Sequence, residues 1–260
     1  MLTRMSTNLL FELLQVALGR RERLSRVPSV REWEEVYENA WKQGVVGLLL
    51  SALERLPADF LPPLELKLQW IGETQIIEQQ NRDMDWKCVE LLGMLEKAGL
   101  RGSILKGQGI ARLYDEELRC RRQSGDIDVY VDCGMEKALA FARSLGQEDI
   151  SWDYKHLHLD LWEETEVEMH YRVEVMYNWA KNGRLQRWFE EHKAQVQGSR
   201  FKVQGVQGDE ITTPTVEFNV FYILLHIYRH FFEAGVGLRQ IVDYFLVLKT
   251  ARLKGFRLVA

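Results

Sequence analysis

Two aspartates stand two residues apart in the segment Gly125-Asp126-Ile127-Asp128-Val129-Tyr130-Val131. If this segment is a strand, Asp126 and Asp128 share one face, and the β-branched residues between and after them face the core. Adjacent carboxylates repel each other unless a cation lies between them. Hard oxygen ligands in an open arrangement suit Mg²⁺ or Mn²⁺. The pair alone fits equally well an edge strand whose acids face water.

A third acid lies in a second segment of alternating polarity, Val167-Glu168-Met169-His170. Three carboxylates from two strands can hold two metal ions about 3.5 to 4 Å apart, an arrangement that serves in-line phosphoryl displacement. We therefore expect the strand of Glu168 to lie beside the strand of the two aspartates. Glu166 has the same strand parity and is the rival third acid. His170 shares this face, where a hydrogen-bonded, partly buried histidine is favoured over a direct role in the site.

The segment Leu105-Lys106-Gly107-Gln108 is predicted to join a strand to a helix. A glycine at such a turn lets the backbone approach a phosphate at the helix N-terminus, and Lys106 can add a point charge beside a triphosphate. We therefore select Lys106 and Gly107 as nucleotide-binding residues. Considered alone, these four residues favour a plain turn with a solvated lysine, and the selection rests on the surrounding motifs.

Three arginines, Arg119, Arg121 and Arg122, precede the acidic pair. Guanidinium forks match phosphate oxygens, so Arg122 is a candidate contact for the triphosphate. Structural neutralisation of the aspartates by Arg122 is the equal alternative. His226 and His230 lie four residues apart on a predicted helix, but no acid stands at the spacing of a zinc site, so we do not select them as metal ligands.

Composition limits the class of protein. The 260 residues are 46% hydrophobic and 28% charged, with a formal charge of −4, so a dedicated nucleic-acid coat is disfavoured. The three cysteines are far apart, which argues against a zinc site and a disulfide scaffold and favours the cytoplasm. No apolar run approaches the roughly 20 residues that span a bilayer, so we expect no membrane association.

The periodicity of apolar residues changes along the chain. It is helical before residue 100, with a long helix expected from Leu64 to Gly99, and becomes typical of strands in the middle third. We expect an α+β fold: a helical subdomain at 1–100, a core with a small mixed sheet at 101–207, and a helical segment at 208–260. The expected strands are 102–105, 127–131, 156–162 and 167–173, and the last two are expected to form a β-hairpin around the polar residues 163–165. The later helices are 108–114, 136–145, 214–233 and 238–253, and 115–124 is expected to be a loop.

These motifs together resemble the uncharacterised nucleotidyltransferase family of the polymerase-β superfamily, over most of the chain from Val30 onward. The resemblance rests on the Lys106-Gly107 turn, the Asp126-x-Asp128 strand, the Glu168 strand, and the later segments 226–230 and 237–243. It implies that Asp126 and Asp128 are metal ligands, that Glu168 is the third carboxylate and that Gly107 belongs to the nucleotide-binding turn.

Two features depart from the wider superfamily. Lys106-Gly107 stands where a glycine-serine or double-glycine turn is usual, with a longer spacer to Asp126, and the third acid is glutamate where many relatives have aspartate. The Lys106-Gly107 turn and the longer spacer to Asp126 both resemble those of the narrower family.

The hypothesis from the sequence is an enzyme that transfers a nucleoside monophosphate from an NTP to a hydroxyl, using Mg²⁺ or Mn²⁺. The acceptor stays open among a small molecule, a protein and an RNA end. One rival is a catalytically degenerate nucleotidyltransferase fold that acts as an interaction module. The other is a D-x-D sugar-nucleotide glycosyltransferase, which expects a nucleotide-binding α/β unit before the aspartates, where this sequence predicts helices.

Overall fold

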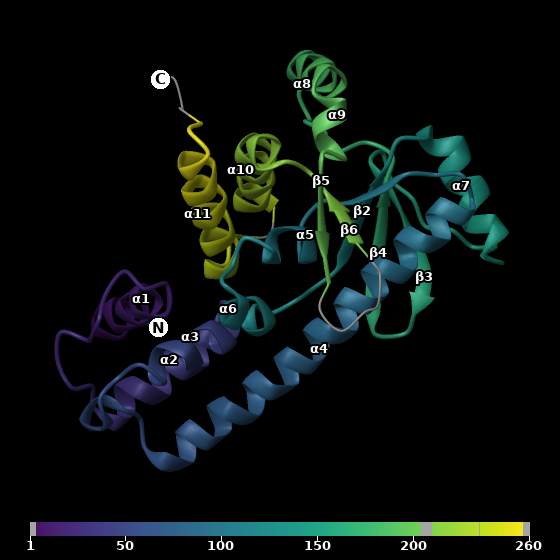
Figure 1. Ribbon diagram of the computed structural model, residues 1–260. Coiled ribbons are helices and arrows are strands. Elements are labelled where there is room, and N and C mark those ends of the chain that lie inside the picture. Colours follow the sequence, from purple (N-terminus) through teal and green to yellow (C-terminus); the bar gives the residue numbers. More distant parts are fainter. Residues whose placement is uncertain (1–3, 204–209, 234, 257–260) are drawn as a thin grey trace. The chain divides into compact units, whose positions relative to one another are not determined.

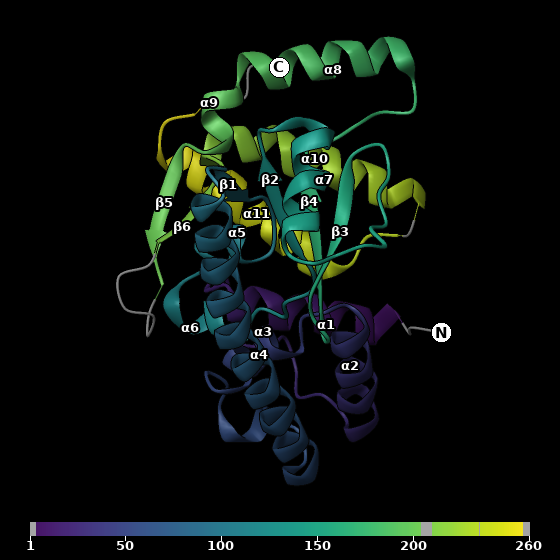
Figure 2. The same cartoon turned by 90° about the vertical axis from the view of Figure 1, so that its right-hand side faces the viewer.

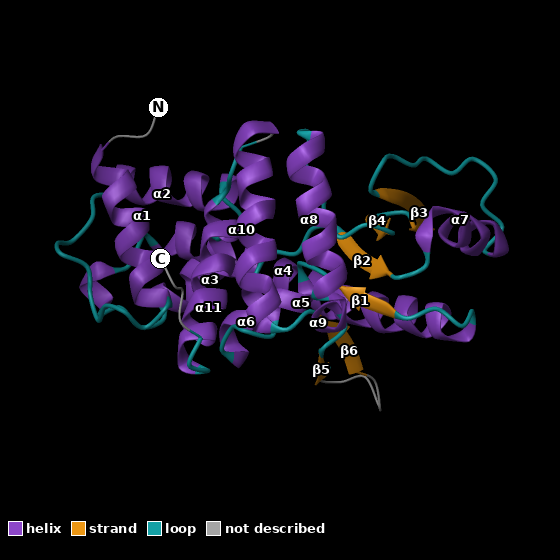
Figure 3. Cartoon of the chain, turned by 90° about the horizontal axis from the view of Figure 1, so that it is seen from above, coloured by secondary structure: helices purple, strands orange, loops and turns teal. Residues whose placement is uncertain are grey.

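A computed structural model describes residues 4–203, 210–233 and 235–256 (Figure 1). Contacts between Cα atoms divide the chain into two compact units, each built from three stretches of sequence. The first unit draws on residues 1–82, 114–124 and 236–242. The second unit draws on residues 83–113, 125–235 and 243–260. The expected α+β class is confirmed, and the described strands all belong to the second unit (Figure 3).

The first unit consists of helices packed around aromatic residues. Trp33 and Trp70 are fully buried with their rings edge to face, and Trp70 Nε1 donates to the Val46 carbonyl oxygen at 2.7 Å. The second helix begins with a capping box, in which the side chains of Ser29 and Glu32 each accept from the other residue's backbone. The helices here are α1 (Arg4–Ala17), α2 (Val30–Lys42), α3 (Val46–Leu53), η1 (Ala58–Phe60), the first half of α4 (Leu64–Lys97) and α6 (Glu116–Arg121).

The segment predicted as a loop at 115–124 contains helix α6, so that prediction is wrong for six residues. The helix is short and has one buried residue, Leu118, which leaves little periodicity to detect. Tertiary contacts hold it instead: Arg121 donates to Ser51 Oγ at 2.8 Å, to Glu54 Oε2 at 2.6 Å and to Glu78 Oε1 at 3.1 Å. One arginine thus ties α3 and α4 to α6.

The second unit is built on a mixed four-stranded sheet with the order β1-β2-β4-β3. Strand β2 runs parallel to β4, whereas β1 is antiparallel to β2 and β3 is antiparallel to β4. The expected pairing of the aspartate strand with the Glu168 strand is therefore confirmed, and β1 pairs with the other edge of β2. The strands are β1 (Gly102–Ile104), β2 (Ile127–Val131), β3 (His156–Trp162) and β4 (Thr165–His170), with β5 (Ser199–Lys202) and β6 (Glu210–Thr213) pairing separately.

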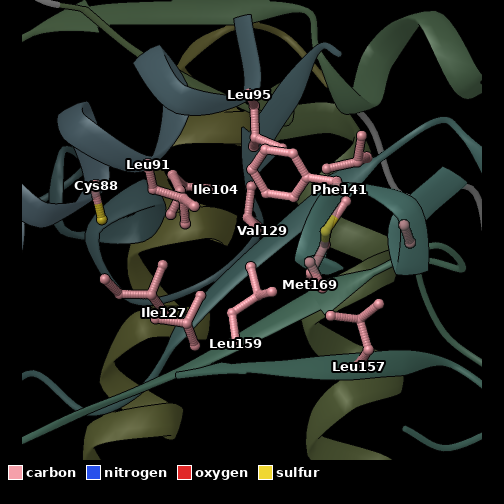
Figure 4. Packing of buried hydrophobic residues seen from close by; sticks show 14 of the residues in the cluster. Cys88, Leu91, Leu95, Ile104, Ile127, Val129, Phe141, Leu157, Leu159 and Met169 are labelled. Atoms are coloured by element: carbon pink, nitrogen blue, oxygen red, sulfur yellow. The ribbon is translucent and has the colours of Figure 1, made fainter. Parts of the chain in front are cut away.

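Helices cover both faces of this sheet (Figure 2). On one face the second half of α4 and helix α7 pack on Ile127, Val129 and the apolar residues of β3 and β4 (Figure 4). On the other face Tyr130 belongs to a core formed with α8, α10 and α11. The helices are α5 (Gln108–Ala111), α7 (Gly134–Ser144), α8 (Trp179–Glu191), α9 (Lys193–Val196), α10 (Val216–Glu233) and most of α11 (Leu238–Leu253).

Two further differences from the sequence-based expectation concern this unit. The helix expected at 108–114 is only four residues long, because residues 112–114 form a turn and a bend. Helices α8 and α9 and strands β5 and β6 were not predicted, and they fill the stretch before α10. Among the described residues, no helix is both long enough and apolar enough to cross a membrane.

Candidate functional site

The parallel pairing of β2 and β4 sets Asp128 directly opposite Glu168. The two strands are in register from Ile127 opposite Val167 onward, so the apolar residues of both strands enter one core and both acids occupy the opposite face. Asp126 precedes β2 by one residue and has the parity of Asp128. The charge of Asp128, together with burial, raises the pKa of Asp126, as expected for neighbouring carboxylates.

The register also separates the two candidate third acids. Glu168 is only partly exposed and its Oε2 atom faces the ring nitrogens of two histidines. Glu166 is mostly exposed, and its Oε1 atom lies 3.1 Å from His158 Nδ1. Glu168 is therefore the acid that β4 aligns with Asp128.

Lys106 does not extend into solvent. Its Nζ atom lies 2.8 Å from Asp128 Oδ1, and its side chain is 15% exposed while that of Asp128 is 1% exposed. Burial lowers the pKa of Lys106, but the charges of Asp128 and Asp126 outweigh this effect and raise it. Burial likewise raises the pKa of Asp128, yet the charge of Lys106 and a hydrogen bond from His170 hold it well below its usual value. The pair is thus charged, and the solvated lysine considered from the sequence is wrong.

His170 is the second partner of the acids and is fully buried. Its Nε2–H group donates to Asp128 Oδ1 at 2.9 Å and lies 3.1 Å from Glu168 Oε2. Burial lowers the pKa of His170, but these two hydrogen bonds outweigh it and raise the pKa. The expected hydrogen-bonded histidine is confirmed, although its burial is complete and not partial.

His156, on β3, is a neighbour that sequence reasoning missed. Its Nδ1 atom lies 3.4 Å from Glu168 Oε2, and its ring centroid lies 5.0 Å from that of His170. Burial and then the charge of His170 lower the pKa of His156 to about 4. The alternation of His156, His158 and Asp160 along one strand was the available signal, because a predicted hairpin with β4 brings alternate residues onto the face of Glu168.

Helix α10 contributes three side chains whose pKa values are shifted in part by the charges of Asp128 and Lys106. Tyr222 is fully buried, its hydroxyl has no hydrogen-bond partner among the described residues, and burial followed by the charge of Asp128 raises its pKa well above the usual value. Burial and then the charge of Lys106 lower the pKa values of His226 and His230. Helix α10 therefore lies within electrostatic range of the acidic cluster.

Gly107 stands between β1 and α5 with φ +51° and ψ −114°, a conformation that side chains rarely adopt. A Cβ atom here would lie 3.5 Å from the Asp126 carbonyl oxygen, so the backbone of the turn passes close to the aspartate strand. The amides of Ile110 and Ala111 both donate to the Gly107 carbonyl oxygen. The turn is therefore internally bonded, and the four residues of α5 are too few to make a helix-end anion site.

Arg122 belongs to the first unit and is buried. Its guanidinium donates to the Gln123 carbonyl oxygen at 3.4 Å, and its own carbonyl oxygen accepts from Asn81 Nδ2 at 2.6 Å. The role of Arg122 toward a nucleotide stays a prediction.

The donor set on the sheet fits a divalent cation. Asp128, Glu168 and His170 each offer one ligand atom, and these atoms lie within 4.8 Å of one another. The charge of Asp128 repels ionised Asp126 and raises its pKa, and a bound cation would offset this repulsion. Lys106 and His170 already share Asp128 Oδ1, so a cation there has to coexist with two positively polarised neighbours.

Comparison with curated proteins finds no match to this chain. A family-level comparison does find one: the sequence profile of a family described as uncharacterised nucleotidyltransferases matches residues 29–257, which include both β2 and β4 and the turn at Gly107. Nucleotidyltransferases typically use a divalent metal, in keeping with the acidic and histidine-rich face of the sheet. Because the match spans most of the sequence, the chain belongs to this family of uncharacterised nucleotidyltransferases.

Proposed function

We propose that the protein transfers a nucleoside monophosphate from an NTP to a hydroxyl acceptor, with pyrophosphate as the leaving group. The observation that carries this proposal is the register of β2 and β4, which sets Asp128 opposite Glu168 with Asp126 two residues away on the same side. Carboxylates from two adjacent strands are a ligand arrangement suited to phosphoryl chemistry. The acceptor is a small molecule, a protein or an RNA end.

Asp126, Asp128 and Glu168 are the proposed ligands of Mg²⁺ or Mn²⁺, because both ions prefer carboxylate oxygens and retain water or phosphate oxygens as further ligands. Bound there, the metal would supply charge stabilisation to the phosphates of the NTP. A bound cation would stabilise the ionised form of Asp126 in particular, since the charge of Asp128 disfavours that ionisation. Among the described residues, no ion pair to Asp126 is formed of the kind that Lys106 forms with Asp128.

Lys106 is proposed to have two roles at this site. Its contact with Asp128 holds that carboxylate ionised and fixes its position. As a buried charged amine beside three acids, it would also attract the triphosphate, since its charge is only partly balanced once a cation joins the acids. Gly107 is proposed to belong to the nucleotide-binding turn, because its positive φ, which other residues rarely adopt, brings the backbone close to the aspartate strand.

A degenerate, non-catalytic fold is the second candidate, favoured by one specific observation. Asp128 already has both Lys106 and His170 as partners, an arrangement that satisfies a buried carboxylate without a metal ion. The glycosyltransferase alternative is weaker, because the elements described before β1 are all helices.

Calorimetric titration of NTP in the presence and absence of Mg²⁺ separates the two candidates without knowledge of the acceptor. The active enzyme should bind NTP with Mg²⁺, and Asp126→Asn should remove the Mg²⁺ dependence while the circular dichroism spectrum stays unchanged. Asp160→Asn, an exposed aspartate on β3, is the matched control and should bind as the wild type does. Equal NTP binding by wild type and Asp126→Asn would favour the degenerate fold.

A further inference from the structure

A second group of ligand-type side chains lies on the same sheet, one strand further out. His156 and His158 alternate along β3, so both face the same side, and β3 pairs with β4 such that His158 is opposite Glu168 and His156 is opposite His170. His156, His158 and Glu168 can each direct one ligand atom to within 4.8 Å of the other two. Neither Asp126 nor Asp128 belongs to this group.

The clearest sign of a ligand is the His156 side chain. The residue is 7% exposed, yet its Nδ1 atom is buried without a hydrogen-bond partner among the described residues. That atom is directed at the cluster, since it lies 3.4 Å from Glu168 Oε2 in a geometry that makes no hydrogen bond. A buried nitrogen without a hydrogen bond is unfavourable, and a bound cation would satisfy it.

Two carboxylates outside the group lie near the two rings. Asp153 Oδ2 lies 3.8 Å from His156 Nε2, the ring nitrogen that faces away from Glu168. Glu166 Oε1 lies 3.1 Å from His158 Nδ1. Carboxylates are common neighbours of ligand histidines in metal sites, where a hydrogen bond from the free ring nitrogen fixes the ring orientation. Glu166, the exposed acid that β4 does not align with Asp128, thus lies beside His158.

The group is also open to solvent on one side. The side chain of His158 is 37% exposed and that of Glu168 is 17% exposed, while His156 forms the closed wall. An ion could therefore enter from the outer edge of the sheet and keep a water ligand. Three protein ligands with one open position are the usual composition of catalytic transition-metal sites.

We propose that His156, His158 and Glu168 bind a divalent transition-metal ion of the Zn²⁺ type, at a site distinct from the Mg²⁺ or Mn²⁺ site proposed at the aspartates. Two imidazoles and one carboxylate suit Zn²⁺, Co²⁺ or Fe²⁺, whereas Mg²⁺ prefers oxygen ligands and retains its water. Glu168 belongs to both sites and would connect them. The inference does not depend on nucleotidyl transfer, because it concerns metal binding alone.

The test is a titration of metal-stripped protein with Co²⁺, whose visible absorption reports binding to imidazole, followed by competition with Zn²⁺. Wild type should bind one equivalent with visible bands, and His158→Ala should weaken binding by about tenfold or more, since it removes a direct ligand. His156→Gln should do the same. Because His158 is partly exposed, its variant should stay folded, which circular dichroism verifies.

Two controls locate the ion. His230→Ala alters the other close pair of histidines, His226 and His230, whose ring centroids are 4.3 Å apart, and should leave Co²⁺ binding unchanged. Asp126→Asn should also leave it unchanged while removing Mg²⁺-dependent NTP binding, so that the two proposals fail separately. Absence of stoichiometric Co²⁺ binding, loss of binding in His230→Ala, or loss in Asp126→Asn with retention in His158→Ala would each overturn the inference.

Discussion

The two aspartates should affect stability in opposite directions when each is replaced by asparagine. Asp128 has Lys106 at 2.8 Å and His170 at 2.9 Å, so Asp128→Asn leaves a buried ammonium with much of its countercharge removed. Asp126 is disfavoured by the charge of Asp128, so Asp126→Asn removes a repulsion. Both variants keep the size of the side chain, which confines the change to charge.

The magnitudes follow from the geometry. Removing one partner of a buried ion pair costs about 3 to 5 kcal/mol, and we expect about 3 because asparagine still accepts a hydrogen bond. Strand residues two apart are about 7 Å from each other, where two unit charges repel by about 2 kcal/mol at an effective dielectric constant of about 20. Attraction of Asp126 to Lys106 offsets part of this repulsion. Asp126→Asn should therefore stabilise the second unit by about 1 kcal/mol.

Hydrogen exchange of the β2 and β4 amides in EDTA measures this effect within the second unit, without the assumption that both units unfold together. Protection should fall in Asp128→Asn, rise slightly in Asp126→Asn and stay constant in the exposed control Asp160→Asn. Equal destabilisation by both site variants would refute the assigned charges, as would an Asp128→Asn variant as stable as wild type.

Three further outcomes are expected. The pKa of Glu32 is lowered to about 2 by its hydrogen bond with Arg26, so its contribution to first-unit stability is present above pH 4.5 and lost as the pH falls toward 2; Glu32→Gln should flatten this part of an acid titration followed by circular dichroism. Gly107→Ala should cost about 1 to 2 kcal/mol in urea denaturation because of its positive φ, whereas Gly183→Ala, inside a helix with open space, should be neutral or stabilising. Tyr222→Phe removes a buried hydroxyl that has no hydrogen-bond partner among the described residues, so it should leave the urea midpoint of the second unit unchanged or raise it.

Strand periodicity was enough to predict which residues of the acidic strand face the core. The positions of Ile127 and Val129 in one apolar cluster, with Asp128 on the opposite face, follow directly from the alternation of side chains. The hairpin of β3 and β4 was predictable for the same reason, with Glu163 and Glu164 as its polar turn. The α+β class was predicted from the change between helical and strand periodicity along the chain.

Strand register and tertiary contacts could not be predicted from local sequence patterns. Glu166 and Glu168 have the same parity, and only the parallel pairing with β2 distinguishes them, because pairing joins segments about forty residues apart along the chain. The contact of Lys106 with Asp128 depends on the antiparallel pairing of β1 and β2 and on the direction of the lysine side chain, and local sequence patterns predict neither. Helix α6 was missed because Arg121 stabilises it through other helices.

The central claim is the class of reaction, and the position of the transferred phosphorus tests it most directly. NTP labelled at the α-phosphorus, or separately at the γ-phosphorus, is incubated with Mg²⁺, purified protein and fractions of cellular small molecules, proteins and RNA. The account predicts transfer of the α label to one fraction with release of pyrophosphate, and no transfer by Asp126→Asn or Asp128→Asn. Transfer of the γ label alone, or α transfer that both variants retain, would contradict it.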